Sequence, residues 1–325
     1  MKLKDSGESA GKWDQGGPIL VTGAAGQLGA VGRTVVSLLL DRGFRVRAMV
    51  RREDERAAAL RAHGAEVVIG DLLEPEDVCR AVNGSRRIYF GMSVSSGYLE
   101  ATVTMAAVAR ELGVDALVNM SQMTVSEMDL QHTSPSRQQR QHWLSEQALG
   151  WSGLPVVTVR PTIFLDSFLT LAGTSVRERG RIELPFGLGK TNPVAAADVA
   201  NVMAAVLADP KPHIGRVIEL TGPKSQDLHG MAREFSEALN RVITYTDIAP
   251  EIFSAALKTL PEHVAQHVVT MAELHRAGRY DRHADGVKEL TGKPPMSVRD
   301  FVSLHAEEFG ARTEGPQKRS ARQTE

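Results

Sequence analysis

The sequence predicts an α/β protein, with a Rossmann-type doubly wound parallel sheet and a smaller, mostly helical C-terminal lobe for substrate. Three observations predict this fold. Short runs rich in β-branched residues alternate with longer helical stretches, a glycine-rich segment follows the first of these runs, and the alternation loosens after Pro161. Such alternation is typical of a parallel sheet that helices cover on both faces.

The chain before Pro161 is expected to form six βα units. Strands are predicted at 19–22, 45–50, 66–69, 87–90, 116–120 and 155–159. Helices are predicted at 28–42, 53–62, 75–82, 99–112 and 137–150. Gly43, Gly64 and Gly113 stand where three of these helices end, a position at which glycine is common.

Helices dominate the chain after Pro161. A helix at 198–208 and a strand at 216–220 are expected to return to the sheet, whereas helices at 227–239, 250–260, 262–276 and 298–309 would cover the carboxyl ends of the strands. Ligands bind at that edge of such sheets. We therefore predict a Rossmann domain at 18–160 to which 191–222 returns, a substrate lobe formed by 161–190 and 223–310, and disordered tails at 1–17 and 311–325.

The composition narrows the function classes. The 325 residues carry 38 Lys and Arg against 39 Asp and Glu, and this net charge of −1 argues against nucleic acid or an anionic membrane as a partner. No apolar run approaches the roughly 18 residues of a membrane span. Cys79, the single cysteine, excludes an intramolecular disulfide and is expected to be buried on the helix at 75–82. We expect a cytoplasmic protein.

The sharpest signal is a glycine-rich segment at the first strand-to-helix junction, Thr22-Gly23-Ala24-Ala25-Gly26-Gln27-Leu28-Gly29. Glycines there permit a tight turn and let the backbone approach a pyrophosphate, and the helix N-terminus supplies free N–H groups. A tight turn without any ligand is the alternative. The position of the segment, ahead of five further βα units, favours dinucleotide binding.

The end of the second predicted strand indicates which dinucleotide is bound. It carries Arg51 and Arg52, whose guanidinium groups suit a 2′-phosphate, in place of the acidic residue that would bind an unphosphorylated ribose. NADP(H) is therefore expected. The alternative is that these arginines are solvated or pair with the acidic residues at 53–55. Asp71, after the third strand, is placed either to reach the adenine or to cap a helix.

Several further segments accompany these in a specific order. They are Gly70-Asp71-Leu72, Ser152-Gly153-Leu154-Pro155, Val159-Arg160-Pro161, 192–200, Leu220-Thr221-Gly222-Pro223 and 290–295. Together with the glycine-rich segment and the arginine pair, they give a chain that resembles the NmrA-like branch of the atypical short-chain dehydrogenase/reductases. The resemblance covers about residues 18 to 310.

The resemblance implies an NADP-binding domain and a family that contains quinone reductases, azo-dye and isoflavone-type reductases, and NADP sensors without catalysis. Carried over by position, cofactor residues from the first turn would be Thr22, Gly23, Gly26, Gln27, Leu28 and Gly29. Arg51 and Arg52 would hold the 2′-phosphate, and Asp71 and Leu72 the adenine edge. The nicotinamide would lie among Gly91, Met92, Ser93, Ser121, Gln122, Thr162 and Phe164. Gly32-Arg33 departs from the family pattern at the start of the first helix.

The sequence lacks the Tyr-x-x-x-Lys dyad that other dehydrogenases of the superfamily use to move a proton. The residues four places after its four tyrosines are Ser93, Thr102, Ala249 and Ala284. The candidate catalytic residues are therefore Ser121 and His142. His142 shares a helix face with Glu146, which could orient it as a proton donor, or the two could form a surface ion pair.

A pair of histidines, His263 and His267, also has the four-residue spacing of one helix face. This spacing can bind zinc, but no third ligand is evident, so a solvated helix face is favoured and no metal is expected.

These observations predict an NADPH-dependent oxidoreductase that passes hydride to a quinone-like or conjugated small molecule. The alternative is an NADP(H)-binding redox sensor that acts through a protein partner, and a biosynthetic tailoring enzyme of narrow specificity is a third option. The sequence leaves the oligomeric state open, with a homodimer as one option.

Overall fold

The computed structural model describes residues 17–26, 30–93 and 95–310. Its central feature is a seven-stranded, fully parallel sheet in the order β3-β2-β1-β4-β5-β6-β8. The strands are β1 (Ile19–Val21), β2 (Val46–Val50), β3 (Glu66–Ile69), β4 (Arg87–Phe90), β5 (Ala116–Met120), β6 (Val156–Pro161) and β8 (Val217–Leu220). The order reverses between β1 and β4, so a ligand crevice is expected there.

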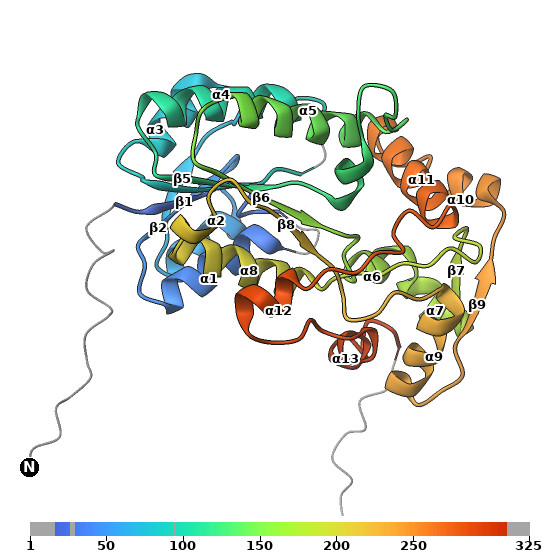
Figure 1. Cartoon of the computed structure of the whole chain (residues 1–325). Helices are drawn as coiled ribbons and strands as arrows, with labels where there is room; N and C mark the ends of the chain where they lie inside the picture. The colour runs from blue at the N-terminus through green and yellow to red at the C-terminus, as the bar shows by residue number, and fades with distance from the viewer. Residues whose placement is uncertain (1–16, 27–29, 94, 311–325) are drawn as a thin grey trace, which may run out of the picture.

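Helices cover both faces of this sheet (Figure 1). One layer holds α3 (Pro75–Val82), α4 (Tyr98–Glu111) and α5 (Arg137–Trp151). The other holds α1 (Val31–Asp41), α2 (Glu55–Ala62), α8 (Ala196–Ala208) and α12 (Gly286–Thr291). This arrangement confirms the predicted doubly wound fold.

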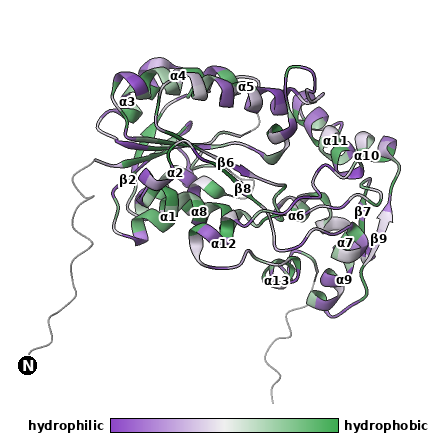
Figure 2. Cartoon of the chain, viewed as in Figure 1, coloured by the Kyte–Doolittle hydropathy of each residue, from purple (hydrophilic) through white to green (hydrophobic). Residues whose placement is uncertain are grey.

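Alternation along the strands builds the two cores. Ile19 and Val21 of β1 pack in the core beneath α1 and α8, whereas Leu20 between them packs in the core beneath α3 and α4. Successive side chains of a strand point to opposite faces, so a strand covered on both sides is expected to be apolar at nearly every position. Figure 2 shows the same pattern in the helices, whose hydrophobic sides face the sheet.

The C-terminal lobe lies beside the sheet and has its own core (Figure 1). Phe168, Phe186, Phe235 and Phe309 are buried in that core. A two-stranded parallel sheet, β7 (Arg181–Leu184) with β9 (Thr244–Asp247), was not predicted. The lobe helices are α6 (Ser167–Leu171), α7 (Gly173–Arg179), α9 (Leu228–Leu239), α10 (Pro250–Ala256), α11 (Glu262–Arg276) and α13 (Val298–Leu304).

The strand predicted at 216–220 joins the sheet as β8, next to β6. The expectation that Cys79 is buried is wrong, because it lies on the solvent side of α3 while its neighbour Val78 faces the core. Two short 3-10 helices, η1 (Met123–Glu127) and η2 (Lys211–His213), complete the elements of the described ranges. The tails were predicted at 1–17 and 311–325, and all of their residues except Gly17 lie outside the described ranges.

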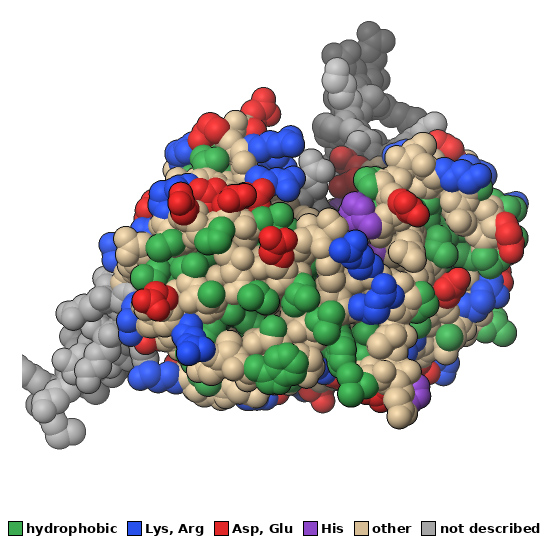
Figure 3. Space-filling view, turned by 90° about the horizontal axis from the view of Figure 1, so that it is seen from above, with side chains coloured by type: hydrophobic (Ala, Val, Ile, Leu, Met, Phe, Trp, Pro, Cys, Tyr) green, Lys and Arg blue, Asp and Glu red, His purple; other side chains and the backbone are tan. Residues whose placement is uncertain are grey.

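The surface over α3, α4 and α5 carries positive and negative side chains interspersed with apolar ones (Figure 3). No single sign of charge dominates this face. Within the described residues, no helix is both long and apolar enough to cross a membrane.

Candidate dinucleotide site

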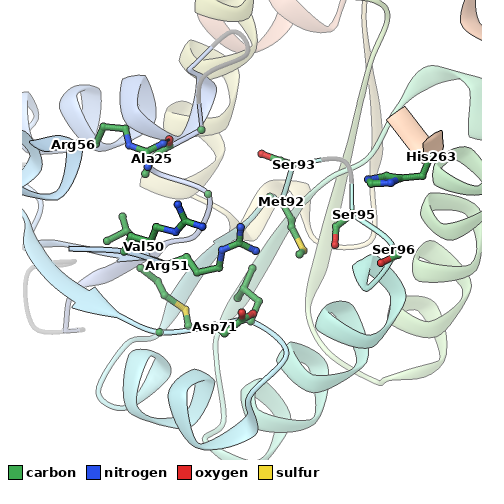
Figure 4. A pocket seen from close by; sticks show the side chains of 17 residues that line it. Ala25, Val50, Arg51, Arg56, Asp71, Met92, Ser93, Ser95, Ser96 and His263 are labelled. Carbon is green, nitrogen blue, oxygen red and sulfur yellow. Dashed lines mark hydrogen bonds between the residues drawn. The ribbon is translucent and has the colours of Figure 1, made fainter. Parts of the chain in front are cut away.

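A cavity of about 850 Å³ opens at the carboxyl ends of β1 to β4, at the point where the strand order reverses. Many predicted cofactor residues line it, namely Gly23, Gly26, Arg51, Arg52, Asp71, Leu72, Gly91, Met92 and Ser93. Gln27, Leu28 and Gly29 fall outside the described residues. The cavity brings together side chains from separate strand ends, as Figure 4 shows.

The glycine-rich turn is held tightly against the loop after β4. Gly23 has a left-handed backbone (φ 64°), and a Cβ atom there would lie 2.7 Å from the Gly91 carbonyl oxygen. The Thr22 hydroxyl donates to that carbonyl at 2.8 Å and accepts from the Gly91 N–H at 3.0 Å. Only glycine fits at position 23, and the close approach leaves the turn's backbone open to a ligand.

Gly32 is one of the two residues at the start of α1 that differ from the family pattern, and the structure gives a reason for the glycine. A Cβ atom on Gly32 would lie 2.7 Å from the Gly23 carbonyl oxygen and 3.1 Å from the Ala24 Cα. The missing side chain therefore lets the first turn of α1 pack directly against the glycine-rich turn. This packing brings the N-terminal end of the helix close to the cavity.

Arg51 and Arg52 are exposed at the edge of the cavity. The acidic residues that follow them bind other arginines, because Glu53 pairs with Arg61 and Asp54 pairs with Arg56. Within the described ranges neither Arg51 nor Arg52 has an ion-pair partner. The alternative that these two guanidinium groups pair with the acidic residues that follow them is therefore not supported.

Arg56 is a cavity residue that the sequence analysis missed. Its Nη1 donates to the Ala25 carbonyl oxygen at 2.9 Å, and its Nε donates to Asp54 Oδ2 at 3.0 Å. The hydrogen bond from Arg56 lowers the pKa of Asp54, which also caps the N-terminus of α2. The signal available in the sequence was a third arginine one helical turn beyond Arg51 and Arg52.

Asp71 lines the cavity, but its backbone and side chain also organise the turn before α3. Its Oδ1 accepts from the Leu73 N–H at 3.1 Å, and its own N–H donates to Asp77 Oδ2 at 2.8 Å. That N–H is the main reason why the pKa of Asp77 is lowered. Since α3 begins at Pro75, the Asp71 side chain closes a turn and does not cap the helix.

The loop after β4 contributes more of the cavity wall than was predicted. Ser95 and Ser96 line the cavity beyond Ser93. Gln138 Oε1 of α5 accepts from the Ser95 N–H at 3.1 Å, and Gln141 Nε2 of α5 donates to the Ser96 carbonyl at 2.5 Å. These two amides hold the loop in place from the adjacent helix.

Ser121 and Thr162 are buried close to the strand ends, and the described cavity wall does not include them. The Thr162 hydroxyl donates to the Asn192 carbonyl at 2.7 Å. No hydrogen-bond partner of Ser121 Oγ is present in the described part of the chain. Their roles beside the nicotinamide therefore remain predictions.

Comparison with protein families matches the NmrA-like family over residues 15–302. The chain belongs to the NmrA-like family. It is 32% identical over 292 residues to a (4-alkanoyl-5-oxo-2,5-dihydrofuran-3-yl)methyl phosphate reductase of Streptomyces griseus, a match covering 90% of this chain and 99% of that protein. Identity is 29% to an NAD(P)H azoreductase of Xenophilus azovorans (90% and 99% covered) and 26% to quinone oxidoreductase 2 of Escherichia coli (88% and 97% covered).

A solved structure has the same fold as this NmrA-like chain. It is an NADPH-dependent quinone oxidoreductase from Escherichia coli complexed with NADPH, with a TM-score of 0.78 at 24% identity. The likeness covers 89% of this chain and 99% of that one.

His142 does not lie where the sequence analysis of this NmrA-like protein expected. It packs against Tyr98 with the ring centroids 4.1 Å apart, and burial lowers its pKa to about 3. Glu146 does not contact it, because both Glu146 carboxylate oxygens accept from Arg160, at 3.0 and 2.5 Å. Both earlier expectations, orientation by Glu146 and a surface ion pair with it, are therefore wrong.

The pair His263 and His267 does not form the solvated helix face that the sequence favoured. His267 is 9% exposed, its Nδ1 lies 2.9 Å from Ser136 Oγ of α5, and burial lowers its pKa to about 4. His263, one turn earlier on α11, lines the cavity. Spacing alone could not show that the pair faces α5 and the cavity.

Proposed function

We propose that this NmrA-like protein uses NADPH to reduce a quinone-like or otherwise conjugated small molecule. It is an NAD(P)H-dependent oxidoreductase, a class to which its named reductase relatives belong. The observation that carries the proposal is the cavity of about 850 Å³ that joins the glycine-rich turn, two arginines without ion-pair partners and the loop after β4. These are the parts that a phosphorylated dinucleotide needs.

The residues present fit an NADP(H) cofactor. The backbone at Gly23 and Gly26 would face the pyrophosphate, because both glycines line the cavity and neither carries a side chain. Arg51 and Arg52 would bind the 2′-phosphate, and Arg56 would hold the turn in shape through the Ala25 carbonyl. When bound, the cofactor supplies a hydride from its nicotinamide ring.

The chain's own contribution to the reaction would be the placement of the cofactor and the acceptor. Met92 and Ser93 would flank the nicotinamide, and the loop that carries them is held by Gln138 and Gln141. Orientation of this kind can supply much of a rate enhancement, since it removes the entropic cost of bringing reactants together. Quinone-like acceptors suit such a site, because the anion that they form on hydride transfer is weakly basic and can take its proton from water.

The acceptors named for the relatives share one chemical feature. A quinone, an azo dye and an acylated dihydrofuranone each hold an electron-poor double bond in conjugation. The purified protein should therefore be tested for NADPH oxidation with a quinone, an azo dye and an unsaturated lactone. Binding of NADPH is measured by fluorescence titration in the same samples.

Saturable turnover with any of these acceptors supports the proposal, whereas NADPH binding without turnover on the whole panel contradicts it. A Gly23→Val variant is the matched negative control, because its side chain would meet the Gly91 carbonyl and close the turn to the cofactor. The variant should lose both binding and turnover. Its secondary structure is checked by circular dichroism.

The second candidate is a redox sensor that binds NADP(H) without turnover. It is favoured by the missing Tyr-x-x-x-Lys dyad and by the burial of His142, which leaves that imidazole neutral at physiological pH. A sensor should bind NADP⁺ and NADPH with very different affinities and reduce no acceptor.

A cytoplasmic location and a homodimer are further predictions, to be checked by cell fractionation and by sedimentation.

A further inference from the structure

Among the described residues that line the cavity, His263 is the one that comes from the C-terminal lobe. Figure 4 shows its ring reaching from α11 toward Ser95, across the cavity from Arg56 and Ala25. Arg51 and Arg52 follow β2, so they mark the adenosine side of the switch point. His263 lies on the other side, next to the loop after β4, where the nicotinamide and the acceptor would meet.

The position of His263 is set by contacts made further along the same helix. One turn later, His267 Nδ1 lies 2.9 Å from Ser136 Oγ at the start of α5. Beyond the end of α11, Arg279 Nη2 donates to the Thr124 carbonyl at 2.8 Å in the segment that follows β5. Contacts within α11 and just after its end therefore attach this part of the lobe to the Rossmann domain, and His263 is held over the cavity.

Other groups that could give up a proton near neutral pH are not available at this end. Burial keeps His142 and His267 neutral, with pKa values lowered to about 3 and about 4. The other titratable groups on the described cavity wall are the arginines and Asp71, and Asp71 already accepts from the Leu73 N–H. Arginine has no role as a proton donor because it stays protonated in proteins, whereas an imidazole side chain can serve as a general acid.

We propose that His263 is a catalytic residue of this protein, the proton donor for acceptors that become strongly basic oxyanions on reduction, such as conjugated enones and unsaturated lactones. The inference rests on the proposed reductase function and names the acceptor class that this end of the cavity would favour. It also places the donor on the lobe, away from the helix on which short-chain dehydrogenases carry their tyrosine.

An enone would be reduced by addition of a hydride and then of a proton. Hydride from NADPH forms a C–H bond at the β-carbon, the C=C π pair moves to the α-carbon and carbonyl as an enolate, and NADPH becomes NADP⁺. The imidazolium N–H bond of His263 breaks, and its proton goes to the enolate. Water then restores the proton on His263. A quinone gives a much less basic hydroquinone anion, which takes its proton from water without help.

This difference in basicity provides the test, with His263→Gln as the variant. Glutamine keeps a hydrogen-bonding group on a side chain of similar length, but its amide cannot act as a general acid. General acid catalysis contributes about 100-fold or more. We expect kcat/KM for an unsaturated lactone to fall by about that factor, while kcat/KM for a benzoquinone changes by less than about threefold. The Kd of NADPH, from fluorescence titration, should be unchanged.

Gln266→Ala is the matched control, because Gln266 is an exposed residue of the same helix and lies outside the described cavity wall. It should leave both acceptors unaffected. Equal losses on the two acceptors in His263→Gln, or a weakened NADPH Kd with an unchanged acceptor ratio, would overturn the inference. If the wild-type protein reduces no acceptor, the proposed function itself fails, and the two failures are thus distinct.

Discussion

The Thr22 hydroxyl and the Gly91 backbone exchange two hydrogen bonds, one in each direction, at 2.8 and 3.0 Å. This pair joins the end of β1 to the end of β4 across the switch point of the sheet. It also sets the distance at which Gly23 passes the Gly91 carbonyl. These hydrogen bonds therefore hold together the loops after β1 and β4, which would enclose the cofactor.

Replacing Thr22 by valine should weaken the connection between the loops after β1 and β4. Valine has the shape of threonine but lacks the hydroxyl, and it leaves the buried Gly91 N–H without its partner, which costs about 1–3 kcal/mol. We expect a lower free energy of unfolding in urea and a several-fold weaker NADPH Kd. Thr22→Ser keeps the hydroxyl and should retain most of both properties. An NADPH Kd in Thr22→Val equal to that of the wild type would contradict the role.

Removing Arg51 and Arg52 together should change cofactor preference. A charge-assisted hydrogen bond contributes about 1.5–3 kcal/mol, so the double alanine variant should bind NADPH at least about tenfold more weakly. NADH lacks the 2′-phosphate and should change little. Both Kd values are measured by fluorescence titration at one salt concentration. Equal losses for the two cofactors would remove the 2′-phosphate assignment.

Arg56 should act differently from its two neighbours, because it binds the protein's own Ala25 carbonyl. Arg56→Ala would loosen the glycine-rich turn and so weaken NADPH and NADH by similar factors, of a few-fold each. Arg56→Lys keeps the charge without the forked geometry and tests whether charge alone suffices. A selective loss of NADPH binding in Arg56→Ala would instead assign Arg56 to the 2′-phosphate.

Glu146 and Arg160 form a two-point ion pair between α5 and β6, with side chains 8% and 17% exposed. Removing one partner of a buried pair costs about 3–5 kcal/mol because the other charge stays desolvated. Glu146→Ala should therefore unfold at clearly lower urea concentration. The double variant Glu146→Ala, Arg160→Met should recover part of that loss, and a double variant less stable than the single one would refute the pairing.

Buried histidines should make the protein less stable in mild acid. Burial lowers the pKa of His142 and His275 to about 3 and that of His267 to about 4. An unfolded histidine has a pKa near 6.5, so below about pH 6.5 the unfolded chain binds protons that the folded chain does not. The stability is present above that pH and should fall by about 1.4 kcal/mol per pH unit for each histidine as the pH drops toward 4.

His275→Phe isolates one of these contributions. His275 is stacked between Phe186 and Tyr280, so phenylalanine preserves the stacking and removes the titration. Urea unfolding at pH 7, 6 and 5 should show a shallower dependence on pH for the variant than for the wild type. Identical slopes would mean that His275 does not titrate differently in the two states.

Periodicity predicted most of the sheet because the information is local. A strand covered on both faces is expected to be largely apolar, and β1 is apolar at all three positions, while β4 and β5 are apolar except at Arg87 and Asn119. Glycine at position 23 was likewise predictable, since a left-handed turn that passes close to a backbone carbonyl tolerates nothing larger. The strands β7 and β9 were missed, because they are four-residue segments that pair with each other only across the lobe.

The sequence by itself determined the doubly wound sheet, the glycine-rich turn and the arginines after β2, each of which depends on neighbours in the chain. Only the tertiary structure decided which histidine faces the cavity. The pairs His142/Glu146 and His263/His267 have the same four-residue spacing, which places two side chains on one helix face but does not say what that face packs against. Packing against Tyr98 buries His142, whereas α11 holds His263 over the cavity, because each helix meets a different neighbour in the folded chain.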